Sequence, residues 1–82
     1  MAVPAFALEA VRASEAYRRN LLKATKALLD EVGDRKVSIN ILVDRVAAKH
    51  SIDTVVVHTA IAQLLRARRL RPINPYFVKK EE

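Results

Sequence analysis

The stretch from residue 46 to residue 65 constrains the fold most, because it predicts two short helices joined by a tight turn. Asp53 is a good N-cap for the second helix. The residues that follow it at helical spacing are Val57, Ile61, Leu64 and Arg68. The three valines at 55–57 favour a strand, but the alanines and leucines after them favour a helix. We therefore predict a helix over residues 54–68, a turn at residues 51–53 and a preceding helix that begins near residue 40.

The predicted helix 54–68 has two different faces when its residues are placed at about 100° intervals. The inner, mostly apolar face carries Val57, Ala60, Ile61, Leu64 and Arg68. The opposite stripe carries Val55, Thr59, Ala62 and Arg66, with His58 and Gln63 at its flanks. This outer stripe is the surface that the helix offers to a partner.

The same stretch is similar to the helix-turn-helix of the winged-helix family. Val46 and Ala47 stand where that family has leucine and alanine, and residues 51–53 stand at its glycine–valine–serine turn. Its threonine–valine pair and its two later leucines are matched by Val56, Val57, Ile61 and Leu64. Ser51 departs from the family's glycine, which supplies a positive φ, so we expect a strained serine here. The resemblance implies a short strand before these helices and a β-hairpin wing after them.

Residues 5–32 predict one long helix, because they lack glycine and proline beyond Pro4 and are rich in helix-forming residues. Gly33, the single glycine, is a natural residue to follow its last turn. At about 1.5 Å per residue this helix is about 42 Å long, more than a small domain needs to cover its own core. Its apolar residues form two stripes, Phe6, Ala10, Ala13, Tyr17, Ala24 and Leu28 in one and Val11, Leu22 and Leu29 in the other.

Two interpretations account for these wide apolar stripes. In one, the whole helix packs into the core of its own small domain. In the other, which we favour, the half after Tyr17 packs on the helix-turn-helix and the alanine-rich half before it packs on a second copy. The predicted dimer interface comprises Phe6, Ala10, Val11, Ala13 and Tyr17.

Short strands are predicted on both sides of the helix-turn-helix. Val37 and Ile39 alternate as in a strand, and residues 70–73 and 76–78 are two strands around Asn74 and Pro75. Pro72 restricts the first of these strands to a sheet edge, so the wing at residues 70–79 is expected to be short. The sequence thus predicts one domain, residues 1–82, mostly α with minor β, of winged helix-turn-helix architecture.

Charge and composition narrow the class of protein. The 82 residues carry a net charge of +6 with an isoelectric point near 10.2, which favours an anionic partner such as nucleic acid. A small basic protein that only adheres to DNA without specificity is the plainer interpretation of this charge. The sequence has no cysteine, so it forms no disulfide bond. Its low content of asparagine and glutamine suggests a thermophilic source. Residues 1–8 lack the features of a signal peptide, so we expect a cytoplasmic protein without membrane contact.

Catalytic chemistry finds little support in the sequence. His50 and His58 lie on either side of the turn, but no metalloprotease, paired-cysteine or serine-hydrolase motif surrounds them. A single glycine leaves no phosphate-binding loop. We therefore expect no enzyme, no cofactor and no metal site.

The favoured function is DNA binding, in a transcription-regulator-like or chromatin-like role, with helix 54–68 in the major groove. Its N-terminal half lacks an arginine that could read guanine, so affinity would come mainly from phosphate contacts and specificity would be modest. The predicted nucleic-acid-binding residues are Lys49, Thr54, Val55, His58, Thr59, Gln63, Arg66, Arg69, Arg71, Lys79 and Lys80.

Two alternatives remain open from the sequence. Val55, Val56, Ala62, Tyr76 and Phe77 are apolar where a DNA reader usually carries hydrogen-bond donors, which indicates a protein–protein interaction module. A small basic RNA-binding or ribosomal protein is the third hypothesis, because double-stranded RNA is recognised by shape and needs few aromatic residues.

Overall fold

Three helices and a small antiparallel sheet make up the computed structural model, which describes the backbone of residues 5–81 and the side chains of residues 14–81. The elements follow in the order α1 (Ala5–Val32), β1 (Val37–Ser38), α2 (Ile39–His50), α3 (Thr54–Arg66), β2 (Leu70–Asn74) and β3 (Phe77–Lys80). The described strands form one sheet in the order β1-β3-β2. The predicted class, mostly α with minor β, is confirmed.

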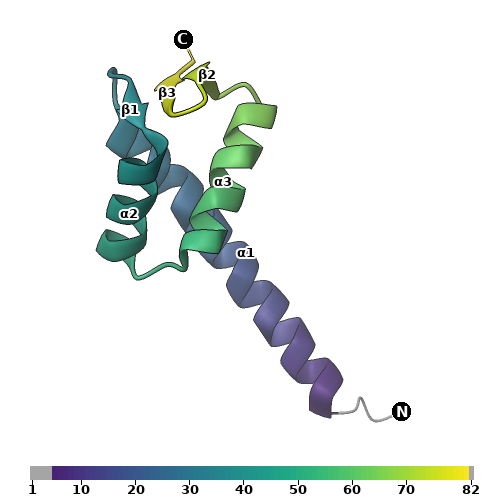
Figure 1. Ribbon diagram of the computed structural model, residues 1–82. Helices are drawn as coiled ribbons and strands as arrows, with labels where there is room; N and C mark the ends of the chain where they lie inside the picture. The colour runs from purple at the N-terminus through teal and green to yellow at the C-terminus, as the bar shows by residue number, and fades with distance from the viewer. Residues whose placement is uncertain (1–4, 82) are drawn as a thin grey trace.

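Helix α1 is a single continuous helix with the predicted bounds. It ends where Gly33 adopts a φ of 57°, and the Gly33 N–H donates to the carbonyl of Leu29 at 3.2 Å. Its C-terminal half packs behind α2 and α3, whereas its N-terminal half extends away from them (Figure 1). This extension accounts for the elongated shape of 53 × 24 × 19 Å.

The core lies between the C-terminal half of α1, the helix pair α2–α3 and the inner face of the sheet. Its buried residues are Ala24, Ala27, Leu28, Val32, Leu42, Val43, Val46, Ile52, Val56, Val57, Ala60, Ile61, Leu64, Leu70 and Val78. The inner face predicted for α3 is confirmed except at Arg68, which is exposed because the helix ends at Arg66. Val56, predicted to lie on the outer surface, is buried instead.

The turn between α2 and α3 has the geometry that the sequence predicts. Ser51 adopts the left-handed conformation, with φ 52° and ψ 46°. The Ile52 N–H then donates to the Ala47 carbonyl at 3.0 Å, and the Ile52 side chain is buried between the helices. The Asp53 carboxylate accepts a 2.9 Å hydrogen bond from the Val55 N–H and so caps α3. These contacts fix the start of α3 relative to α2.

The hairpin of β2 and β3 closes the core at the C-terminal end of α3. The Asn74 carboxamide oxygen accepts hydrogen bonds from the N–H groups of Tyr76 and Phe77, at 2.8 and 3.0 Å, which shapes the turn. Strand β1 pairs with β3 through Val37 opposite Val78. The predicted strand at residues 37–39 is one residue shorter, because Ile39 begins α2 and donates its N–H to the Tyr76 carbonyl.

Candidate nucleic-acid interface

The N-terminal half of α3 presents the predicted outer stripe to solvent. Thr54, Val55 and His58 are exposed, and Thr59 is half-buried. The Thr59 hydroxyl donates to the Val55 carbonyl at 3.0 Å, so its single proton is engaged within the helix. Val55 is 68% exposed, although it is a large apolar residue. This half of the helix therefore offers few free donors for a base edge.

This surface also includes two residues of α2 that were not predicted from the sequence. Asn40 and Asp44 line an open pocket of about 390 Å³ together with Val43 and with Thr54 and His58 of α3. Their spacing of four residues puts both on one face of α2, a signal that was available in the sequence. Asp44 and the cap residue Asp53 make the N-terminal end of α3 locally acidic, which disfavours phosphate contacts there.

The opposite end of α3 is basic. Arg66 ends the helix, and Arg69, Arg71, Lys79 and Lys80 follow on the connection and on the two hairpin strands. We call these five residues the C-terminal basic surface. Arg71 lies opposite Lys79, and Lys80 lies opposite Leu70. Glu81 is the single acid among residues 66–81, and its N–H donates to the Arg69 carbonyl at 3.0 Å.

The cations of the C-terminal basic surface have no carboxylate partner within the part of the chain whose side chains are described. Both ion pairs found there involve Glu31, which meets Arg45 at 3.6 Å and Lys49 at 3.9 Å. Four of the five cations are exposed, and Lys79 is half-buried. Glu81 lines a pocket with Arg71, Lys79 and Lys80 and offsets part of their charge, but five cations against one acid leave this end of the molecule with a net positive charge that attracts an anionic partner.

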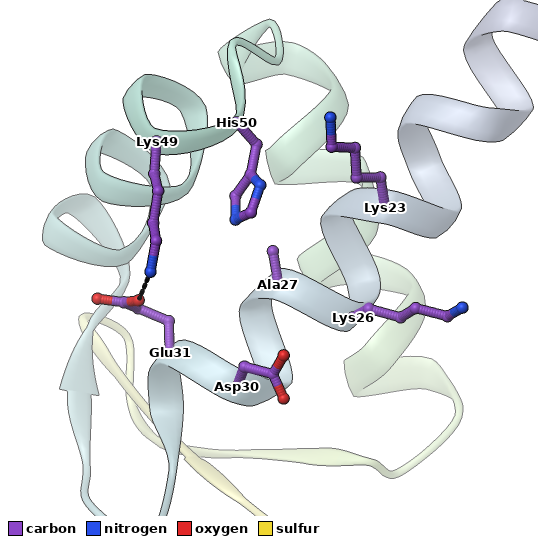
Figure 2. Close-up of a pocket in the computed structure, with 7 residues that line it drawn as sticks. All are labelled: Lys23, Lys26, Ala27, Asp30, Glu31, Lys49 and His50. Carbon is purple, nitrogen blue, oxygen red and sulfur yellow. Dashed lines mark ion pairs between the residues drawn. The ribbon is translucent and has the colours of Figure 1, made fainter.

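Lys49 belongs to a different surface from the other predicted contacts. It lines a cleft of about 240 Å³ between α1 and the C-terminal end of α2, where Lys23, Lys26 and His50 also lie (Figure 2). Asp30 and Glu31 of α1 line the same cleft. These acids offset part of the positive charge of the cleft.

Gln63, predicted to lie at a flank of the outer stripe, lies on the flank that faces α1. Its side chain is exposed but lines an open groove with Arg18, Leu21, Leu22 and Thr25 of α1. Gln63 therefore lies on the flank of α3 that faces α1. Among the residues predicted to read bases, this leaves Thr54, Val55, His58 and Thr59 on the outer stripe.

The predicted dimer interface falls mostly outside the described side chains. Phe6, Ala10, Val11 and Ala13 belong to that undescribed part. Tyr17 is 42% exposed, and Leu22, which lies about 140° around the helix from it, is 63% exposed. Residues 14–20 are all exposed, so this part of α1 contacts little of the rest of the chain.

The described part of the chain has neither a metal-binding cluster nor a membrane-spanning helix. Residues 14–81 hold no group of three His, Asp or Glu side chains arranged to bind a metal ion. No described helix combines the length and apolar character needed to cross a bilayer.

Comparison with protein-family models, with curated proteins and with solved structures yields no match. The functional assignment therefore rests on the distribution of charge and exposed residues described above.

Proposed function

We propose that this chain is a winged-helix domain that binds double-stranded DNA and catalyses no reaction. The order of elements supports the proposal: a helix, a short strand, two helices joined by a tight turn, and a hairpin whose second strand pairs with the first strand. In such a domain, α3 enters the major groove and the hairpin serves as the wing.

The C-terminal basic surface carries the proposal. Its five cations lie at or beyond the C-terminal end of α3, and among the described side chains none of them forms an ion pair with a carboxylate. Phosphates of a duplex are regularly spaced anions that such a cluster fits, and phosphate contacts supply most of the affinity of non-specific binding. We therefore assign phosphate contacts to Arg66, Arg69, Arg71, Lys79 and Lys80.

Base contacts would come from the first two turns of α3. Val55 suits the methyl group of thymine, and His58 can donate a hydrogen bond to a purine acceptor. Asp44 would accept from a cytosine amino group if the duplex approaches this end closely. With no arginine at these positions, recognition would be of modest specificity.

The test is binding to a fluorescently labelled random-sequence duplex, measured by anisotropy. We expect the double variant Arg66→Ala/Arg69→Ala to bind about tenfold or more weakly at about 50 mM salt, since each lost phosphate contact forgoes counterion release. The matched control, Lys23→Ala/Lys26→Ala, removes two exposed cations from α1 and should change affinity by less than about twofold. Equal losses in both double variants would mean that only net charge matters and would sink the proposed interface.

Protein–protein interaction is the second candidate, and Val55 favours it. This valine is 68% exposed at the N-terminal end of the outer stripe, and Tyr76 at the hairpin turn is 70% exposed. Exposed apolar side chains of this size mark partner surfaces. The same titration separates the two candidates: a chain that serves a protein partner through Val55 should bind the duplex weakly at low and high salt alike.

Pairing of two copies through the N-terminal half of α1 forms part of the proposal. Its support is the exposure of Tyr17 and of the neighbouring residues 14–20 on a helix that extends beyond the rest of the chain (Figure 1). A dimer would present two α3 helices to successive major-groove turns if they lie about 34 Å apart. Sedimentation at tens of micromolar should show a dimer, and a monomer at that concentration would remove this part of the proposal.

A further inference from the structure

A groove between β1 and the start of α2 combines apolar and cationic side chains and takes no part in the proposed duplex contacts. Its volume is about 430 Å³. Val37, Ile41 and Phe77 supply its apolar lining, and Arg35, Lys36 and Arg45 supply the cations. None of the residues that line it is acidic. This differs from the cleft at Lys49, where two acids line the same space.

The apolar lining is available to a partner because its side chains are only partly buried in the core. Ile41 is 50% exposed, whereas its neighbours Leu42 and Val43 are buried. The Phe77 ring is half-buried and carries Lys36 above it, with Nζ 5.6 Å from the ring centroid. An aliphatic side chain placed on Ile41 would bury apolar surface that water now covers, which is favourable in proportion to the area removed.

The cations around this lining set the charge of the partner. Arg35 and Lys36 are exposed and have no ion-pair partner among the described side chains, while Arg45 shares Glu31 with Lys49. Opposite charge across an interface increases the rate of association and excludes partners of like charge. The groove therefore favours an acidic partner.

The backbone at this edge favours an extended partner. In the described sheet, β1 pairs with β3 on one side and has no strand on the other. Such an edge leaves backbone N–H and C=O groups that a further strand can pair with. Figure 1 shows β1 at the end of the sheet directly above α2.

We propose that this groove binds an extended, acidic segment of a partner protein, with one aliphatic side chain of that segment seated on Ile41 and Val37. A nucleic-acid strand fits the groove less well, because its phosphates would match the cations but leave the aliphatic surface of Ile41 wet. The inference does not depend on the proposed duplex binding, because that proposal assigns no contact to any residue that lines this groove.

The experiment uses two fluorescein-labelled decapeptides, one of glutamates around a central leucine and the other with serine in place of that leucine. Anisotropy titrations with the wild-type chain should show that the leucine peptide binds at least about fivefold more tightly, as expected for one partly buried leucine. Ile41→Ser should abolish that difference, and Lys36→Glu should weaken both peptides by about fivefold or more through charge repulsion. Lys23→Glu is the matched control for charge and should affect both peptides less than about twofold.

Each other outcome overturns the inference. Equal affinity of the two peptides means that the groove attracts charge alone and has no aliphatic seat. Dissociation constants above about 1 mM for both peptides mean that no useful binding surface exists. If Ile41→Ser weakens binding of a random-sequence duplex as much as it weakens the leucine peptide, the groove belongs to a nucleic-acid site. The Arg66→Ala/Arg69→Ala variant tests the duplex proposal separately, and it should leave the preference for the leucine peptide unchanged.

Discussion

Arg71 lies directly opposite Lys79 in the antiparallel pairing of β2 with β3. Two cations at directly opposed positions repel each other and destabilise a hairpin, so an acid at either position would make a more stable protein. On a surface that binds an anion, the pair is no longer unfavourable, since a bound phosphate offsets the repulsion between Arg71 and Lys79. The Arg71–Lys79 pair is therefore expected to lower the stability of the free protein and to strengthen the proposed phosphate binding.

Replacing Lys79 should change stability and binding in opposite directions. We expect Lys79→Glu to raise the free energy of unfolding by about 0.2–1 kcal/mol, because repulsion with Arg71 becomes attraction. The same variant should bind a duplex more weakly. Lys80→Glu, which faces Leu70 across the strands, is the control and should weaken binding without a comparable gain in stability. Urea denaturation measures the first effect, and equal stabilities of the two variants would show that the Arg71–Lys79 repulsion is negligible.

Ser51 holds a left-handed conformation that a glycine adopts without strain. Ser51→Gly should therefore stabilise the protein, because relief of about 1–2 kcal/mol of left-handed strain exceeds the roughly 0.5–1 kcal/mol that the extra freedom of glycine in the unfolded chain costs. Ala48→Gly, at an exposed position inside α2, should destabilise by about 1 kcal/mol and serves as the control. Thermal denaturation distinguishes the two, and a loss of stability in Ser51→Gly would contradict the positive φ at this turn.

Two leucines on α1 should respond very differently to truncation. Leu28 is fully buried against α2 and α3, so Leu28→Ala should lower the free energy of unfolding by about 2–5 kcal/mol. Leu22 is mostly exposed, so Leu22→Ala should change it by about 0.5 kcal/mol or less. Similar losses in urea denaturation would mean that α1 packs on a different face from the one described.

The cap at the start of α3 should contribute measurably to stability. Asp53→Ala removes the carboxylate that accepts from the Val55 N–H, and we expect a loss of about 1 kcal/mol. Asp34→Ala, an exposed acid in the loop after α1, controls for the change in charge. Should both variants unfold at the same urea concentration as the wild type, the capping hydrogen bond would have no net effect.

Local signals in the sequence were sufficient for the elements and turns. The absence of glycine and proline from residues 5–32 predicted α1 with its observed bounds, and Gly33 marked its end. The Asp53 cap and the positive φ of Ser51 followed from helix capping and from the resemblance to a helix-turn-helix. Each of these features depends on a few neighbouring residues, so the sequence alone carries it.

Features that depend on packing were harder to predict. Val56 is buried because α3 packs on both α1 and α2, and a helix between two neighbours buries a wider arc than one amphipathic stripe. The pairing of Lys49 with Glu31, which lie on different helices, also had no local signal.

The predicted end of α3, at residue 68, is two residues later than the observed end at Arg66, because no glycine marks the end of the helix. Arg68 adopts a φ of 58°, and the N–H groups of Arg68 and Arg69 donate to the carbonyls of Leu65 and Leu64. This is the hydrogen-bonding pattern of a helix that ends in a left-handed residue, a position usually taken by glycine. The helical spacing of Arg68 therefore predicted a continuation that the backbone does not make.

The salt dependence of duplex binding tests the central claim, phosphate contact by the C-terminal basic surface, most directly. Between about 50 and 200 mM salt, five contacts predict a log–log slope of about −4.5, from five times −0.9. Removing two cations in Arg66→Ala/Arg69→Ala should make the slope shallower by about 1.8, from two times 0.9. A flat salt response, or the same slope in the wild type and the double variant, would contradict the account.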